Sequence, residues 1–225
     1  MVGGSFTNSR SSRLIDLPTT GDKDGGYRGY DHATWYVGNA KQAASWYITR
    51  YGFKLVAYRG LETGSRYVAS YVVTNNRVRF VLVSPIQGLA RLQHDGAAAS
   101  EKAEVEGIYA HLEKHGDAVK DIAFEVDDAP AVYASAVAKG AESVRKPECQ
   151  EDGGGQVILA TIKTYGDTTH TFIERRNYRG IFLPGYRLIS AVDPISQYLP
   201  DVPLIVIDHC VGNQDWNGME AVCNL

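Results

Sequence analysis

An order of one strand, one capped helix and three strands occurs twice in this chain of 225 residues, and this repeat constrains its fold most. Asn39 is placed to cap a first helix that stops at Gly52, and Asp128 and Gly140 have the same roles in a second. The two caps lie 89 positions apart and the two glycines 88 apart. β-branched and aromatic runs predict strands at 30–37, 53–58, 67–73 and 78–83, and again at 119–126, 143–146, 156–164 and 169–174. We therefore predict an α+β fold of repeated βαβββ modules.

A third copy starts near the end of the sequence. Residues 204–209 predict a strand, Gly212-Asn213 repeats the earlier Gly38-Asn39, and a helix is expected to open from Asp215. We interpret this as a third module that is truncated; the alternative is a terminal strand and helix packed on the second module. The predicted organisation is a mobile tail at 1–27, a domain of two modules at 28–186, and a linker with the start of a catalytic domain at 187–225.

The segment between the two modules predicts a loop at 85–100 and an amphipathic helix at 101–115 with Val105, Ile108 and Leu112 on one face. The remaining expectations concern side chains. On the second helix, the side chains expected to point inward are Val132, Tyr133, Ala136 and Val137. Three histidines are expected to be solvated: His94, His111 and His115. His170 is expected to be buried and hydrogen-bonded.

Composition excludes several classes of protein. With 23 basic and 26 acidic residues the net charge is −3, so neither nucleic acid nor an anionic membrane is an expected partner. The three cysteines are odd in number and form no CxxC pair, which indicates neither a disulfide framework nor a structural zinc site. Because no signal peptide or membrane-spanning segment is recognisable, we expect a cytoplasmic protein.

Five stretches of the sequence together resemble the 4-hydroxyphenylpyruvate dioxygenases. They are Ala57–Arg66, Val119–Val126, Lys163–Thr171, Phe182–Tyr186 and Ile207–Gln214. The resemblance implies the vicinal-oxygen-chelate fold, with four modules in the complete enzyme, and a homo-oligomer. It also implies Fe(II) as cofactor and the conversion of 4-hydroxyphenylpyruvate and O2 to homogentisate and CO2, in tyrosine and phenylalanine catabolism.

The resemblance assigns two site residues. His209 stands where this family has its first iron ligand, and Val211 matches a position that lines the substrate pocket. By the same resemblance the second histidine and the carboxylate come from a fourth module, which the 225 residues do not contain. Since one imidazole cannot form a two-histidine, one-carboxylate iron site, we expect no dioxygenase activity from this chain alone.

Three alternatives stay open at this stage. His32, Asp121 and Glu174 would be a chemically reasonable set of hard-metal ligands within the first two modules, although the resemblance implies a metal-free scaffold there. The chain could instead be a non-catalytic scaffold or oligomerisation module. A dioxygenase similar to hydroxymandelate synthase would share the fold, the substrate and the ligands.

Overall fold

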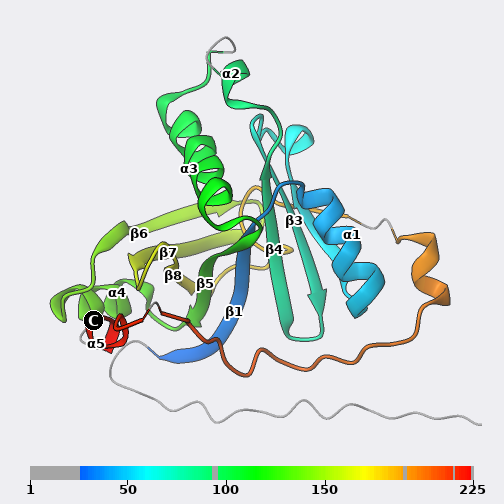
Figure 1. The fold of residues 1–225 in the computed structure, drawn as a ribbon. Helices are drawn as coiled ribbons and strands as arrows, with labels where there is room; N and C mark the ends of the chain where they lie inside the picture. Colours follow the sequence, from blue (N-terminus) through cyan, green and yellow to red (C-terminus); the bar gives the residue numbers. More distant parts are fainter. Residues whose placement is uncertain (1–25, 93–95, 190–191, 215, 224–225) are drawn as a thin grey trace, which may run out of the picture.

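Nine strands form a single, strongly curved sheet in the computed structural model, which describes residues 26–92, 96–189, 192–214 and 216–223 (Figure 1). The strand order is β6-β7-β8-β5-β1-β4-β3-β2-β9. The tail predicted at 1–27 lies outside the described residues except for its last two, and β1 already begins at Tyr27. Among the described helices, none is long and apolar enough to cross a membrane.

The first half of the sheet follows the predicted order. Its elements are β1 (Tyr27–Tyr36), α1 (Ala40–Tyr51), β2 (Lys54–Arg59), a 3-10 turn (Leu61–Thr63), β3 (Val68–Asn75) and β4 (Val78–Pro85). Asn39 caps α1 by accepting from the backbone N–H of Gln42 at 3.0 Å, and Gly52 ends the helix with a left-handed φ of 64°. β4, the last strand of this half, returns to lie beside β1, and the two strands pair in parallel.

The second half repeats this order. Its elements are β5 (Ala118–Val126), α4 (Ala129–Ala138), β6 (Ser143–Asp152), β7 (Gly155–Lys163) and β8 (Thr169–Glu174). Asp128 caps α4 as predicted, and β5 pairs parallel with β8. Of the residues predicted to point inward from α4, Val137 is exposed, because it lies in the last turn, beyond the sheet contacts of Val132, Tyr133 and Ala136. β1 and β5 pair antiparallel and join the two halves.

Helices cover both faces of the sheet. α1 and α4 pack on one face through Leu82 and Phe172, whereas α3 (Ala99–His115) packs on the other face, against Val81 and Val83. α3 buries Val105 and Ile108 as predicted.

His111 is 8% exposed, so the prediction that it is solvated was wrong. It lies one turn from Ile108, and its ring packs edge-on against the ring of Tyr36. The predicted loop before α3 contains a short helix, α2 (Leu89–Leu92).

The last forty residues differ most from the prediction. They contain β9 (Arg187–Leu188), a 3-10 helix (Pro194–Tyr198) and α5 (Met219–Cys223), but the strand expected at 204–209 does not form. The segment runs past the tip of the β3–β4 hairpin, where Arg77 donates from its backbone N–H to the carbonyl of Ile205 at 3.0 Å. One such bond is no ladder, and a strand requires a row of backbone partners.

Candidate functional site

His209 lies in the extended segment at 199–214, on the surface of the molecule. Its side chain is 73% exposed, and its Nδ1 lies 2.8 Å from Oδ2 of Asp208. Val211, two residues further on, is 74% exposed. The structure therefore places both predicted site residues side by side along one open segment, with the Nε2 of His209 free of any bond to the part of the chain described here.

The β3–β4 hairpin positions the beginning of this segment. The side-chain amide of Asn75 donates to the carbonyls of Tyr51 at 2.9 Å and Val202 at 2.6 Å. Asn76, which turns the hairpin with a left-handed φ of 52°, donates to the carbonyl of Leu204. Leu204 and Ile207 pack against the core between α1 and the sheet. The two asparagines at the tip of the hairpin thus also hold the segment that carries His209.

His32, Asp121 and Glu174 are not brought together. His32 and Asp121 both line a cavity on the α3 face of the sheet. The carboxylate of Glu174 instead accepts from the backbone N–H of Ala129 at 3.1 Å, at the first turn of α4 on the opposite face. Thr171 on the same strand lines the cavity. Glu174 follows it by an odd number of positions, so the side chain of Glu174 points to the opposite face of the sheet. Within the described ranges, no three His, Cys, Asp or Glu side chains form a group that could hold a metal ion.

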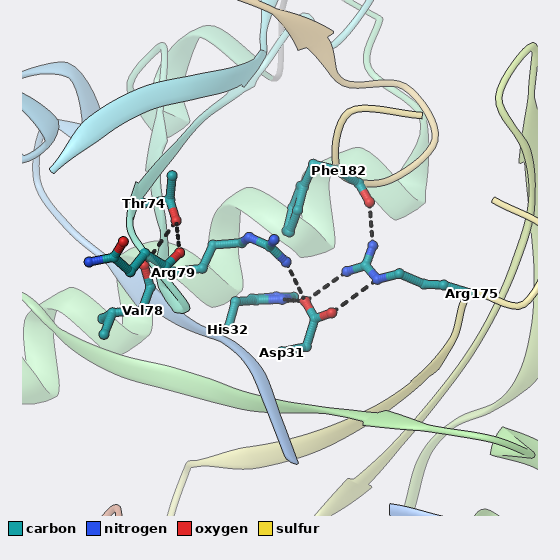
Figure 2. A network of polar contacts seen from close by, with 8 residues as sticks. Asp31, His32, Thr74, Val78, Arg79, Arg175 and Phe182 are labelled. Atoms are coloured by element: carbon teal, nitrogen blue, oxygen red, sulfur yellow. Dashed lines mark hydrogen bonds and ion pairs between the residues drawn. The ribbon is translucent and has the colours of Figure 1, made fainter. Parts of the chain in front are cut away.

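A buried acid dominates the electrostatics next to this cavity. Asp31 accepts from Nε and Nη2 of Arg175 at 3.0 and 2.7 Å and from Nδ1 of His32 at 2.5 Å (Figure 2). A register shift in the β1–β5 pairing between Tyr30 and His32 lets the adjacent side chains of Asp31 and His32 meet. Burial alone would raise the pKa of Asp31, but the bond from His32 and the charge of Arg175 hold it well below its usual range.

The same network fixes the segment after β8. Arg175 also donates from Nη1 to the carbonyl of Phe182, and the guanidinium groups of Arg175 and Arg79 each lie 5.4 Å from the centre of the Phe182 ring (Figure 2). Phe182 is buried and lines the cavity beside His32. The network therefore ties β1 and β4 of the first half to a segment that follows the second half.

Sequence reasoning missed Asp31, Arg79 and Arg175. The only available signal is an acid that interrupts the otherwise apolar and aromatic run at 30–37, next to a histidine. His170 forms the predicted hydrogen bond, because its Nδ1 donates to the carbonyl of Thr169 at 3.1 Å, but its side chain is half-buried and not buried as predicted. His94 lies outside the described residues.

A family profile described as the Glyoxalase/Bleomycin resistance protein/Dioxygenase superfamily matches residues 29–174, which span both βαβββ halves. The chain belongs to this superfamily. A solved structure of a triple mutant of 4-hydroxymandelate synthase from Streptomyces coelicolor has the same fold, with a TM-score of 0.58 over 78% of this chain and 45% of that chain, at 23% identity. This likeness concerns the fold alone.

Several curated proteins resemble the sequence more closely. The 4-hydroxyphenylpyruvate dioxygenase of Aspergillus fumigatus is 58% identical over 198 residues, and that of Coccidioides posadasii is 57% identical over 201 residues. The enzyme of the same name from Dictyostelium discoideum is 44% identical over 195 residues. The matches cover 86–88% of this chain but only 49% of each relative, so the chain spans about half the length of these proteins.

Proposed function

We propose that this chain is part of a 4-hydroxyphenylpyruvate dioxygenase: the part that carries one pair of βαβββ modules and the segment with the first iron ligand, His209. The observation that carries the proposal is the 58% identity over 198 residues to an enzyme of that name. Identity at this level extends over 88% of the chain. The proposal includes Val211 as a substrate-pocket residue, a homo-oligomer and a cytoplasmic location.

Iron in such enzymes needs two imidazoles and one carboxylate on one face. The described residues supply the imidazole of His209 but group no second histidine or acid with it in a metal-binding arrangement. They therefore do not fit a complete iron site, and the other two ligands must come from residues outside those described. His209 is suited to its part, because Asp208 holds Nδ1 and so fixes which nitrogen faces a metal.

The test joins residues 1–225 in frame to the matching second half of the Aspergillus fumigatus relative. We expect the joined protein, with Fe(II) and 4-hydroxyphenylpyruvate, to consume O2 and release CO2 in equal amounts and to form homogentisate. The 225-residue chain alone should match the free-iron blank. His209→Ala in the joined protein should abolish turnover, whereas His170→Ala, a matched change on the face of the sheet that α4 covers, should retain it.

Three results would count against the proposal or one of its parts. A joined protein that folds, as judged by circular dichroism, but consumes no O2 would contradict the assignment of the activity. A joined protein that forms 4-hydroxymandelate in place of homogentisate would favour the synthase alternative. Full turnover by His209→Ala would contradict the assignment of the ligand and leave the enzyme class standing.

A further inference from the structure

A second site candidate lies far from His209 in the sequence, on the α3 face of the sheet. A cavity of about 570 Å3, open to solvent, is lined there by strands of both halves, by α3 and by the segment that contains Phe182 and Tyr186. Cavities of this size are typical of small-molecule sites. Its lining divides into a polar floor, apolar walls and a basic mouth, and each part restricts what the cavity can bind.

The floor presents two polar groups with free hydrogen-bonding capacity. His32 is only 6% exposed, and its Nδ1 is occupied by Asp31, while its Nε2 has no partner among the described residues. Asp121 accepts from Thr169 and Thr171 at 2.6 and 2.9 Å, both on Oδ1, and its Oδ2 has no partner in the same part of the chain. Burial raises the pKa of Asp121 despite both threonine bonds, so its carboxylate would gain from a further donor.

The pairing of β1 with β5 places these groups close together. Thr34 lies opposite Asp121 and His32 lies opposite Ala123, so His32 and Asp121 are diagonal neighbours on one face of the sheet. Both line the cavity. The two side chains therefore face one cavity from neighbouring strands.

The mouth of the cavity is basic. Arg145 on β6 is exposed and Arg59 on β2 is half-buried, and neither guanidinium forms an ion pair or side-chain hydrogen bond with another described residue. Two acids line the cavity besides Asp121. Asp167 is already paired with Lys114 and His115, and Glu104 lies on α3. A free guanidinium is a strong site for a carboxylate.

The walls between floor and mouth are apolar and aromatic. They comprise Val81, Val83, Leu159, Ile173, Phe182 and the rings of Tyr36 and Tyr186. We propose that this cavity binds a small aromatic acid with a hydroxyl group opposite its carboxylate: the carboxylate meets Arg145 at the mouth, the ring lies between the walls, and the hydroxyl donates to Asp121 at the floor. This site is separate from His209 and goes beyond the proposed function.

The test is calorimetric titration of the 225-residue chain in a chelating buffer with 4-hydroxyphenylacetate. This probe has the required groups but no α-keto group to chelate a metal, so its binding is independent of the dioxygenase activity. We expect saturable binding that is about tenfold weaker in Arg145→Ala, which removes one charge-assisted contact. Asp121→Asn should weaken the hydroxylated probe about tenfold but leave phenylacetate, which lacks the hydroxyl, unchanged.

Two matched variants keep the test specific. Lys146→Ala removes a positive charge from the neighbouring position on β6, which does not line the cavity, and should bind the probe like the unchanged chain. His209→Ala should also bind it unchanged. The proposal would be overturned if no saturation is seen up to about 10 mM probe, because the dissociation constant would then be larger than about 10 mM. So would binding that Arg145→Ala and Asp121→Asn leave intact, or binding that is lost in His209→Ala.

Discussion

At the scale of single residues, Asp31 shows how a charge can be kept in a place from which water is almost excluded. Its side chain is 2% exposed, yet two guanidinium groups and an imidazole surround it. Such a group is stable only while its partners stay in place, because a buried charge that loses its counter-charge carries its full desolvation cost. The network therefore makes Asp31 more sensitive to substitution than any exposed acid of the chain.

Asp31→Asn should lower the free energy of unfolding by about 3–5 kcal/mol, because it leaves Arg175, whose side chain is only 15% exposed, without its carboxylate. Urea denaturation followed by circular dichroism measures this. The matched control is Asp167→Asn, which breaks the exposed pairs with Lys114 and His115 and should cost about 1 kcal/mol or less. Equal losses in the two variants would contradict the role given to the buried network.

The two buried acids Asp31 and Asp121 should respond to pH with opposite sign. The pKa of Asp31 is lowered from 3.8, so its stabilisation is complete above that value and is lost as the pH falls below it. The pKa of Asp121 is raised from 3.8 by burial, so its folded state loses stability as the pH rises through the raised value. The stability deficit of Asp31→Asn should therefore shrink on acidification.

Urea denaturation at several pH values between about 3 and 7 checks both signs. Relative to the unchanged chain, Asp121→Asn should become more favourable as the pH rises, while its amide oxygen still accepts from Thr169 and Thr171. Parallel pH curves for Asp31→Asn and Asp121→Asn would contradict the assigned shifts.

At the scale of elements, the sequence predicts best what depends on neighbours along the chain. The caps Asn39 and Asp128 are where local rules place them, because each accepts a hydrogen bond from a backbone N–H three residues further along the chain. The strand predicted at 204–209 failed because a strand needs a partner that the local pattern does not specify.

The same reasoning separates what was foreseen of the candidate site from what was not. His209 and Val211 were singled out by resemblance, and they remain assignments that await the joined-protein experiment. Asp31 and His32 meet through a register shift, and Arg175 reaches Asp31 from 144 positions away. Neither a bulge nor such a long-range contact leaves a periodic trace in the sequence.

Asn75 joins three elements, which gives a prediction at this scale. Asn75→Asp keeps the shape of the side chain but removes the amide donor to Tyr51 and Val202. We expect faster amide hydrogen exchange at Arg77, whose N–H is bonded to Ile205, and unchanged exchange in β1. Asn39→Asp, which adds the same charge but keeps a cap acceptor, is the control and should leave Arg77 unaffected. Unchanged exchange at Arg77 in Asn75→Asp would contradict the link.

At the scale of the whole molecule, the two βαβββ halves share one sheet. The β1–β5 pairing runs the length of both strands, and Arg175, which follows the second half, is bonded to Asp31 in the first. α3 adds packing against β1 and β4, strands of the first half, and the Phe182 segment closes over the same face. Because each half provides the edge partner of the other, neither half has a complete set of strand neighbours alone.

We therefore expect the two halves to unfold together. The tryptophans Trp35 and Trp46 report on the first half, and no tryptophan occurs between 47 and 215, whereas far-ultraviolet circular dichroism reports on both halves. Trp216 is 97% exposed and should change little in fluorescence. The urea midpoints from fluorescence and from circular dichroism should coincide, as required of a two-state transition. In Asp31→Asn, which removes a tie between the halves, both midpoints should fall together. A fluorescence transition that precedes the circular dichroism transition would show that the first half unfolds alone and that the shared sheet does not couple the halves.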